Sequence, residues 1–216
     1  MRKTSYAVTF VAAAAILVLN VLSVRSPEWI IVKYPEIFRS KVTDYYGLTD
    51  KCQLQVVRIP NPSESGHLDY TTYSCREFPD NATDHCDQEN SAFCIAWTSA
   101  GYVSQIAIGF VSMSLVAILF GLTTHSRRRR IWRAVAGLVS LQTSLQIVCF
   151  ALVTDTYRNS TFQPFEQGRP GIGYVLNTVS WVLGVLTTGA VIMTGLAADK
   201  GHQWAAGNRA YQPIEG

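Results

Sequence analysis

Four long stretches of this 216-residue chain lack charged side chains almost entirely, although 15% of all its residues are charged. They contain one charged residue, Arg133, and they cover residues 6–24, 95–123, 131–154 and 171–198. A helix rises about 1.5 Å per residue, so even the shortest stretch covers about 29 Å, close to the thickness of a bilayer's hydrocarbon core. This distribution of charge argues against a water-soluble globular domain and predicts four membrane-spanning helices.

The four spans contain no aspartate, glutamate or lysine. An ion-coupled or proton-coupled transporter normally has an ionisable group at mid-membrane, whereas Arg133 is close enough to a span end for its side chain to reach the head groups. We therefore do not expect transport by this chain alone. Polar side chains within spans normally face protein rather than lipid; here they are Asn20, Gln105, Gln142, Gln146 and Asn177. Gln142 and Gln146 are spaced i, i+4, so they share one helix face and are expected to hydrogen-bond to a neighbouring helix, with contact to a partner as the alternative.

The segments between the spans lack a recognisable catalytic grouping. A membrane enzyme would need clustered histidine, aspartate or glutamate near a span, and His202 stands alone in the last segment. We therefore expect no enzymatic activity, no cofactor and no small-molecule substrate.

Lysine and arginine are concentrated beside two of the spans, at Arg2 and Lys3 and in the run Arg127–Arg130. The positive-inside rule places these segments, and with them both termini, in the cytoplasm. A basic run beside a span normally sets topology and contacts membrane lipids, so nucleic acid is not an expected partner. The expected cytoplasmic segments are 1–5, 124–130 and 199–216, and the expected extracellular segments are 25–94 and 155–170.

The first span has a second interpretation. The start "MRKTS", the apolar run and the small residues in "VLSVRS" also fit a cleaved signal peptide, which would leave three spans. Because the apolar run is longer than the usual core of a signal peptide, we prefer a retained helix.

Four of the five cysteines lie in the long segment 25–94, where an extracellular compartment would be oxidising. They predict two disulfides with three possible pairings. We prefer Cys52 with Cys75 and Cys86 with Cys94, because the second pair closes a small loop directly before a span.

A metal site is the weaker interpretation of these cysteines. His67 and His85 are nearby in the sequence, but the segment has no Cys-x-x-Cys knuckle, and a zinc site suits a reducing compartment better. The fifth cysteine, Cys149, lies within a span and is expected to pack there as a small apolar residue.

Asn81 and Asn159 each begin an Asn-x-Thr glycosylation sequon, and both lie in segments expected to be outside. The long segment also contains runs of β-branched and aromatic residues that predict antiparallel strands, namely "EWIIVKY", "CQLQVVRI" and "YTTYSC". The expected fold is thus an all-α membrane four-helix bundle with a small, disulfide-stapled extracellular antiparallel β-sheet.

A tryptophan, a Gly-Leu pair and two cysteines follow one another in the long segment, as Trp29, Gly47-Leu48, Cys52 and Cys75. Together with the four spans, this order resembles the claudin superfamily of tetraspan membrane proteins. The closer likeness is to small fungal plasma-membrane members, the PalI-like tetraspans, through "CREFPD", "FCIAWTSAGY" and "VSWVLGVL". Thr49 replaces the family tryptophan, and the sequence ends in Ile-Glu-Gly rather than Tyr-Val; both departures argue against a tight-junction protein.

The resemblance implies that the tryptophan and the Gly-Leu pair lie where the outer sheet meets the helix bundle, and that the two cysteines clamp neighbouring strands. The residue chemistry agrees, because an indole is favoured at interfacial depth and a glycine permits close backbone approach. The simpler interpretations, with Trp29 as an ordinary belt aromatic and Gly47 as a turn residue, stay open.

Small residues recur every four positions in the last span, at Ser180, Gly184 and Thr188. They form a seam for close helix contact, either inside the bundle or with a partner. We expect a non-enzymatic, multi-pass plasma-membrane protein that acts as a structural or accessory subunit, through lateral association with a larger membrane protein or with copies of itself. The alternative, which the PalI likeness implies, is a sensor of ambient pH with His67 and His85 as titrating groups.

Overall fold

The computed structural model describes residues 3–36, 40–60, 67–87, 89–123, 128–159, 162–202 and 205. They form two compact units. The helical unit comprises Met1–Asn20, Gln105–Ile147 and Val179–Gly216, and the sheet unit comprises Val21–Ser104 and Val148–Thr178. Residues 1–2, residues 124–127 of the expected basic loop and most of the expected tail lie outside the described residues.

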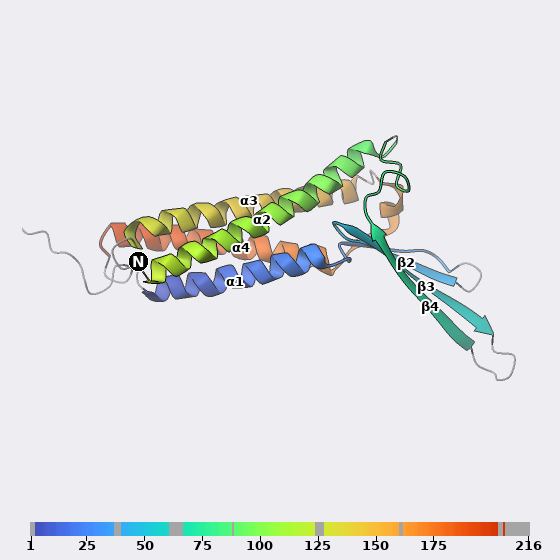
Figure 1. The fold of residues 1–216 in the computed structure, drawn as a ribbon, viewed down its shortest axis with the longest axis horizontal. Helices are drawn as coiled ribbons and strands as arrows, with labels where there is room; N and C mark the ends of the chain where they lie inside the picture. The colour runs from blue at the N-terminus through green and yellow to red at the C-terminus, as the bar shows by residue number, and fades with distance from the viewer. Residues whose placement is uncertain are drawn as a thin grey trace, which may run out of the picture. The chain divides into compact units, whose positions relative to one another are not determined.

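Four long helices occur in the described chain: α1 (Lys3–Arg25), α2 (Ser91–Thr123), α3 (Arg128–Arg158) and α4 (Ile172–Asp199) (Figure 1). Each contains a segment long and apolar enough to cross a membrane, namely Thr4–Arg25, Ser91–Gly121, Ile131–Arg158 and Ile172–Asp199. The chain is therefore a multi-pass membrane protein with four candidate spans, as its charge distribution predicts.

The helices extend beyond the expected spans at several ends. α2 begins at Ser91 rather than at residue 95, and α3 ends at Arg158 rather than at residue 154. Hydropathy marks only the apolar part of a helix, whereas the backbone continues through polar residues until something stops it. Pro27 follows the end of α1, and Pro170 precedes the start of α4, where proline is tolerated.

The core of the helical unit is built by apolar side chains from all four helices. Its buried members are Tyr6, Ala13, Ile16, Val111, Ile118, Trp132, Val135, Ala136, Val139 and Val191. Association of helices in lipid depends on such close packing, because lipid chains are as apolar as the side chains themselves.

The small-residue seam on α4 faces this interior. Ser180 is fully buried and donates a hydrogen bond to the side-chain oxygen of Asn20 on α1. Gly184 is buried against Thr143 of α3, whose hydroxyl occupies the space that a Cβ at this position would need. Thr188 is half-buried. Ser180 and Gly184 therefore serve contacts inside the chain, the first of the two roles considered for the seam.

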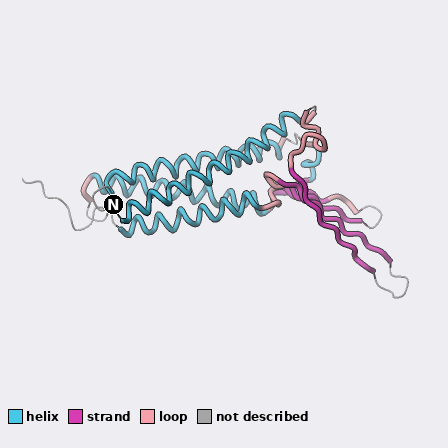
Figure 2. Tube along the Cα trace, in the orientation of Figure 1, coloured by secondary structure: helices cyan, strands magenta, loops and turns pink. Residues whose placement is uncertain are grey.

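The sheet unit contains a five-stranded antiparallel sheet in the order β4-β3-β2-β1-β5 (magenta in Figure 2). The strands are β1 (Ile30–Lys33), β2 (Ser40–Tyr46), β3 (Asp50–Pro60), β4 (His67–Glu77) and β5 (Gly168–Pro170). A short 3₁₀ helix, η1 (Gln163–Gln167), leads into β5. The fold thus combines four apolar helices with a small antiparallel sheet, as expected.

Two strands lie where the sequence runs do not predict them. The runs "EWIIVKY", "CQLQVVRI" and "YTTYSC" correspond to β1, β3 and β4, but β2 and β5 are additional. β2 includes Lys41 and Asp44, which weaken its apolar pattern, and β5 contains a glycine and a proline. Because β5 pairs with β1, both segments expected to be extracellular contribute to one sheet.

Candidate functional site

Trp29 joins the sheet to the ends of two helices within the sheet unit. Its side chain is fully buried, its backbone N–H donates to the Tyr46 carbonyl at 2.9 Å, and its indole N–H donates to the Ser23 carbonyl of α1 at 2.7 Å. Its own carbonyl accepts from Gly171 N–H at 2.8 Å. On α4, the indole fills the space where Gly173 would otherwise carry a side chain. Trp29 is therefore an anchor and more than a belt aromatic.

Gly47 and Leu48 lie in the turn between β2 and β3. The Gly47 N–H donates to the Asp50 carbonyl at 2.8 Å, and the Gly47 carbonyl accepts the Trp97 indole N–H of α2 at 3.0 Å. A Cβ at position 47 would lie 2.9 Å from that same Asp50 carbonyl oxygen. Leu48 is buried, whereas Thr49 is exposed. The turn thus needs glycine both for its tightness and for its contact with α2.

Two disulfides brace the sheet unit. Cys52 and Cys75 lie directly opposite each other in the β3–β4 register and are bonded, with their Cα atoms 4.0 Å apart. Cys86 is bonded to Cys94 in the first turn of α2. This is the pairing preferred from the sequence. Within the described residues, no group of three or more histidine, cysteine or acidic side chains is placed to hold a metal ion.

One face of the sheet, the covered face, packs under a cluster of aromatic rings. Tyr46 of β2 is in edge contact with Phe78 and Phe165, each with ring centroids 5.1 Å away. The cluster draws on β2, the segments after β4 and α3, and the first turns of α2; its other rings are Phe93, Trp97 and Phe162. Burial beneath this cover raises the pKa of Tyr46 far above its ordinary value.

A buried carboxylate lies on the covered face beside Tyr46. Asp44 accepts a hydrogen bond from the Tyr46 hydroxyl at 3.3 Å and from the Gln53 amide at 3.0 Å, and it pairs with Lys51 at 2.8 Å. Burial, followed by the charge of Asp44, raises the pKa of Tyr34. These contacts satisfy Asp44 internally, so it is a structural residue and is not poised for chemistry.

A second ion pair ties the end of β4 to the segment that follows it. Arg76 donates two hydrogen bonds to Asp84, at 2.6 and 2.7 Å, and the Asp80 backbone N–H donates a third at 2.9 Å. Burial by itself would raise the pKa of Asp84, but the hydrogen bonds and the charge of Arg76 outweigh it and lower that pKa. The hydrogen bond to Asp84 likewise raises the pKa of Arg76.

The opposite face of the sheet, the open face, presents a row of mixed side chains. Successive side chains in a strand alternate between faces, so the pairing register assigns Ile31, Tyr45, Leu54 and Tyr73 to this face. Tyr73 is 55% exposed, and the other three are half-buried. The Cys52–Cys75 disulfide lies on the same face by the same register.

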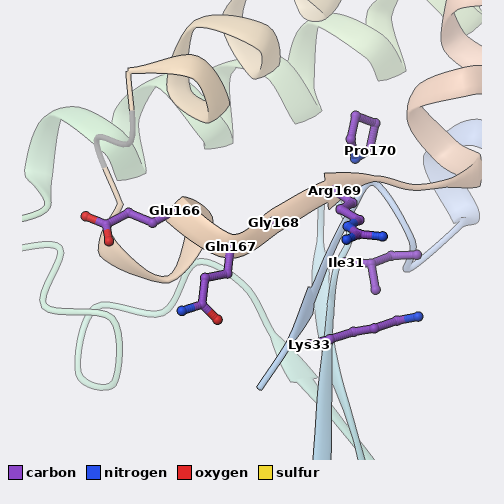
Figure 3. Close-up of a pocket in the computed structure, with 7 residues that line it drawn as sticks. All are labelled: Ile31, Lys33, Glu166, Gln167, Gly168, Arg169 and Pro170. Carbon is purple, nitrogen blue, oxygen red and sulfur yellow. The ribbon is translucent and has the colours of Figure 1, made fainter. Parts of the chain in front are cut away.

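A pocket of about 600 Å³ lies at the edge of the sheet, where η1 leads into β5 beside β1. Figure 3 shows Arg169, Ile31 and Lys33 on one side of β1 and Glu166 pointing away from them. Gln167, Gly168 and Pro170 complete the lining. Lys33 and Arg169 are both exposed, and no ion pair involves either of them among the described residues.

The other expected site residues are dispersed over the sheet unit. Asn81 and Asn159 are exposed, whereas the last residue of the second sequon, Thr161, lies outside the described residues. His85 is exposed with a positive φ of 54°, and the side chain of His67 is outside the described part. Cys149 is buried in α3. These residues do not converge on a common site in the described structure.

Several residues that organise the sheet unit were not expected from the sequence. Trp97 reads as an ordinary apolar residue of a span, and Phe162 and Phe165 lie in a polar loop. The local signal that could have identified Trp97 is its position in the first turns of α2, near one end of a candidate span, because an indole is favoured at a membrane interface, where it has both apolar and hydrogen-bonding partners.

Comparison with models of known protein families and with curated proteins gives no match. These comparisons assign the chain to no family.

Proposed function

We propose that this protein is a non-enzymatic, claudin-like tetraspan of the plasma membrane that acts as a structural or accessory subunit of a larger membrane protein. In this proposal both termini are cytoplasmic and the sheet unit is extracellular. Support comes from the four candidate spans, from the braced antiparallel sheet, and from the anchoring contacts of Trp29 and Gly47.

The observation that carries the proposal is the contrast between the two faces of the sheet. Aromatic rings pack over Tyr46 on the covered face, while the open face leaves Tyr73 exposed and Leu54 and Ile31 half-buried on a scaffold braced by a disulfide. Aromatic side chains such as Tyr73 are typical anchors at protein interfaces. The open face is therefore suited to contact the extracellular part of a partner.

The membrane spans offer less for such contact. Ser180 and Gly184 pack against Asn20 and Thr143 inside the helical unit, so these two residues of the seam already have contacts in the same chain. The remaining exposed side chains of the helices are mainly apolar, as lipid contact requires. The choice of partner is therefore better explained by contacts of the open face than by contacts of the membrane spans.

The proposal is tested by isolating the tagged full-length chain from its own membranes in mild detergent and identifying what co-purifies. Tyr73→Glu changes the open face, and Tyr70→Glu is the matched control, because Tyr70 lies on the same strand, faces the other way and is 62% exposed. We expect Tyr73→Glu to release a membrane protein that the wild-type and Tyr70→Glu chains retain.

Both variants must keep the two disulfides and reach the cell surface, which non-reducing electrophoresis and surface labelling report. If the Tyr73→Glu chain retained the same partner, the open face would not be the surface that contacts it. A wild-type chain isolated alone would contradict the accessory role itself.

The pH-sensor alternative gains no specific support from the described residues. His85 is exposed, and the structure describes no side-chain contacts for His67. The alternative stays a prediction from the PalI likeness.

A further inference from the structure

We propose that Lys33 and Arg169 form a binding site for the phosphate of a phospholipid head group at the edge of the sheet. The proposal concerns lipid and does not depend on the accessory function or on its protein partner.

The pairing register brings the two cationic side chains together. Ile31 of β1 lies directly opposite Arg169 of β5, so Lys33, two residues further along β1, is the diagonal neighbour of Arg169. Diagonal neighbours in an antiparallel pair are about 7–8 Å apart at Cα and point to the same face. Two long, flexible cationic side chains at that spacing can converge on one phosphate group.

The charges in and around this pocket favour an anion. Glu166 lines the same pocket, but it points away from Arg169 and Lys33 (Figure 3). Two acidic side chains of the sheet unit are engaged elsewhere: Asp44 lies on the covered face with Lys51, and Glu36 pairs with Arg58 at 3.8 Å. Lys33 and Arg169 thus have no carboxylate within ion-pairing distance in the described structure.

The pocket lies close in sequence to a candidate span, so a membrane lipid is the anion that it is best placed to bind. Arg169 is three positions before Ile172, where both α4 and its candidate span begin. A chain segment of that length spans at most about 10 Å, comparable to the depth of the interfacial layer beside the hydrocarbon core. The guanidinium therefore lies within reach of the lipid phosphates, and arginine can hold a phosphate in a bidentate manner.

The phosphate could also be free in solution, so the experiment has two arms. Full-length protein in mild detergent is titrated with a short-chain phosphatidylglycerol, and bound lipid is counted by native mass measurement. The second arm repeats this titration in excess inorganic phosphate. The variants are Lys33→Gln, Arg169→Gln and their double substitution. Lys41→Gln is the matched control, because Lys41 is an exposed lysine diagonally beside Lys33 on the open face, but it lies two strands away from Arg169 and does not line the pocket.

We expect the wild-type chain to bind one phospholipid that inorganic phosphate does not displace. Each single substitution should weaken that binding about tenfold, and the double substitution should abolish it, whereas Lys41→Gln should bind as the wild type does. If all variants bound the phospholipid equally well, Lys33 and Arg169 would not form its binding site. Complete displacement by inorganic phosphate would overturn the assignment to lipid. Both side chains are exposed, so unchanged disulfides and thermal unfolding are expected for every variant.

Discussion

The indole N–H of Trp97 donates a hydrogen bond to the backbone carbonyl of Gly47 at 3.0 Å, and both residues are buried. This contact joins the β2–β3 turn to α2 within the sheet unit. Trp97→Phe removes the donor and leaves a buried carbonyl without this partner, so we expect a loss of about 1–3 kcal/mol in the free energy of unfolding. Denaturant unfolding of the disulfide-intact protein in detergent measures it, and an unchanged midpoint would contradict the contact's role.

Gly184 and Gly189 provide a matched pair on α4. A Cβ at Gly184 would collide with Thr143, whereas a Cβ at Gly189 would meet nothing within 4 Å. We expect Gly184→Leu to misfold and to be retained inside the cell, because overpacking typically costs about 1–3 kcal/mol or more, and Gly189→Leu to be delivered normally. Surface labelling compares the two. Normal delivery of Gly184→Leu with loss of a bound partner would instead place the seam at an interface.

The Cys52–Cys75 disulfide is expected to act as one unit. Losing a disulfide from a small exported domain typically costs about 2–5 kcal/mol, so Cys52→Ser and Cys75→Ser should each impair export. The double variant should be little worse than either single one, because the same bond is lost each time. Surface yield and unfolding temperature test this, with Cys149→Ala as a control that keeps both disulfides. Additive losses would show that the two cysteines act separately.

The pairing of Asp84 with Arg76 predicts a pH-dependent contribution to stability. The folded-state pKa of Asp84 is lowered, so the contribution is complete above the unfolded pKa of about 3.9 and is lost as the pH falls through the folded pKa. Asp84→Asn should cost about 1–3 kcal/mol near neutral pH. Exposure of 36% of the Arg76 side chain keeps the expected cost toward the lower end, because solvent screens the charge.

Unfolding of the wild-type and Asp84→Asn chains is compared between pH 7 and pH 2. The difference should stay constant down to about pH 5 and shrink below about pH 4. A difference that persists unchanged at the lowest pH would show that the charge of Asp84 is not its source.

The proposed topology predicts that Asn81 carries a glycan. Asn81 is exposed after β4, whereas the Asn159 amide already donates a hydrogen bond to Asp155 at 2.7 Å. We expect glycosidase to lower the apparent mass of the wild-type chain and to leave Asn81→Gln unchanged. Cleavage at Arg127–Arg130 by protease added outside intact cells would contradict the topology.

Signals that are local in the sequence account for the features that could be predicted. Stretches almost without charge predict all four helices, and the four cysteines in one segment predict the two disulfides. The aromatic cover was not predictable, because Phe78, Phe93 and Phe162 come from separate segments and meet only through the fold. β2 was missed for a different reason. Its Asp44 is buried by contacts with Lys51 and Gln53 that no local pattern reveals.

The pairing of β1 with β5 constrains the order in which the protein can be assembled. β1 is synthesised directly after α1, but its partner strand emerges only after α2 and α3 are complete. At ordinary rates of translation this delay is on the order of ten seconds. Until then, one edge of β1 has unpaired backbone groups that could pair with another chain. A newly made chain therefore passes through a period of exposure to chaperones and to misassembly that ends only when the segment before α4 arrives.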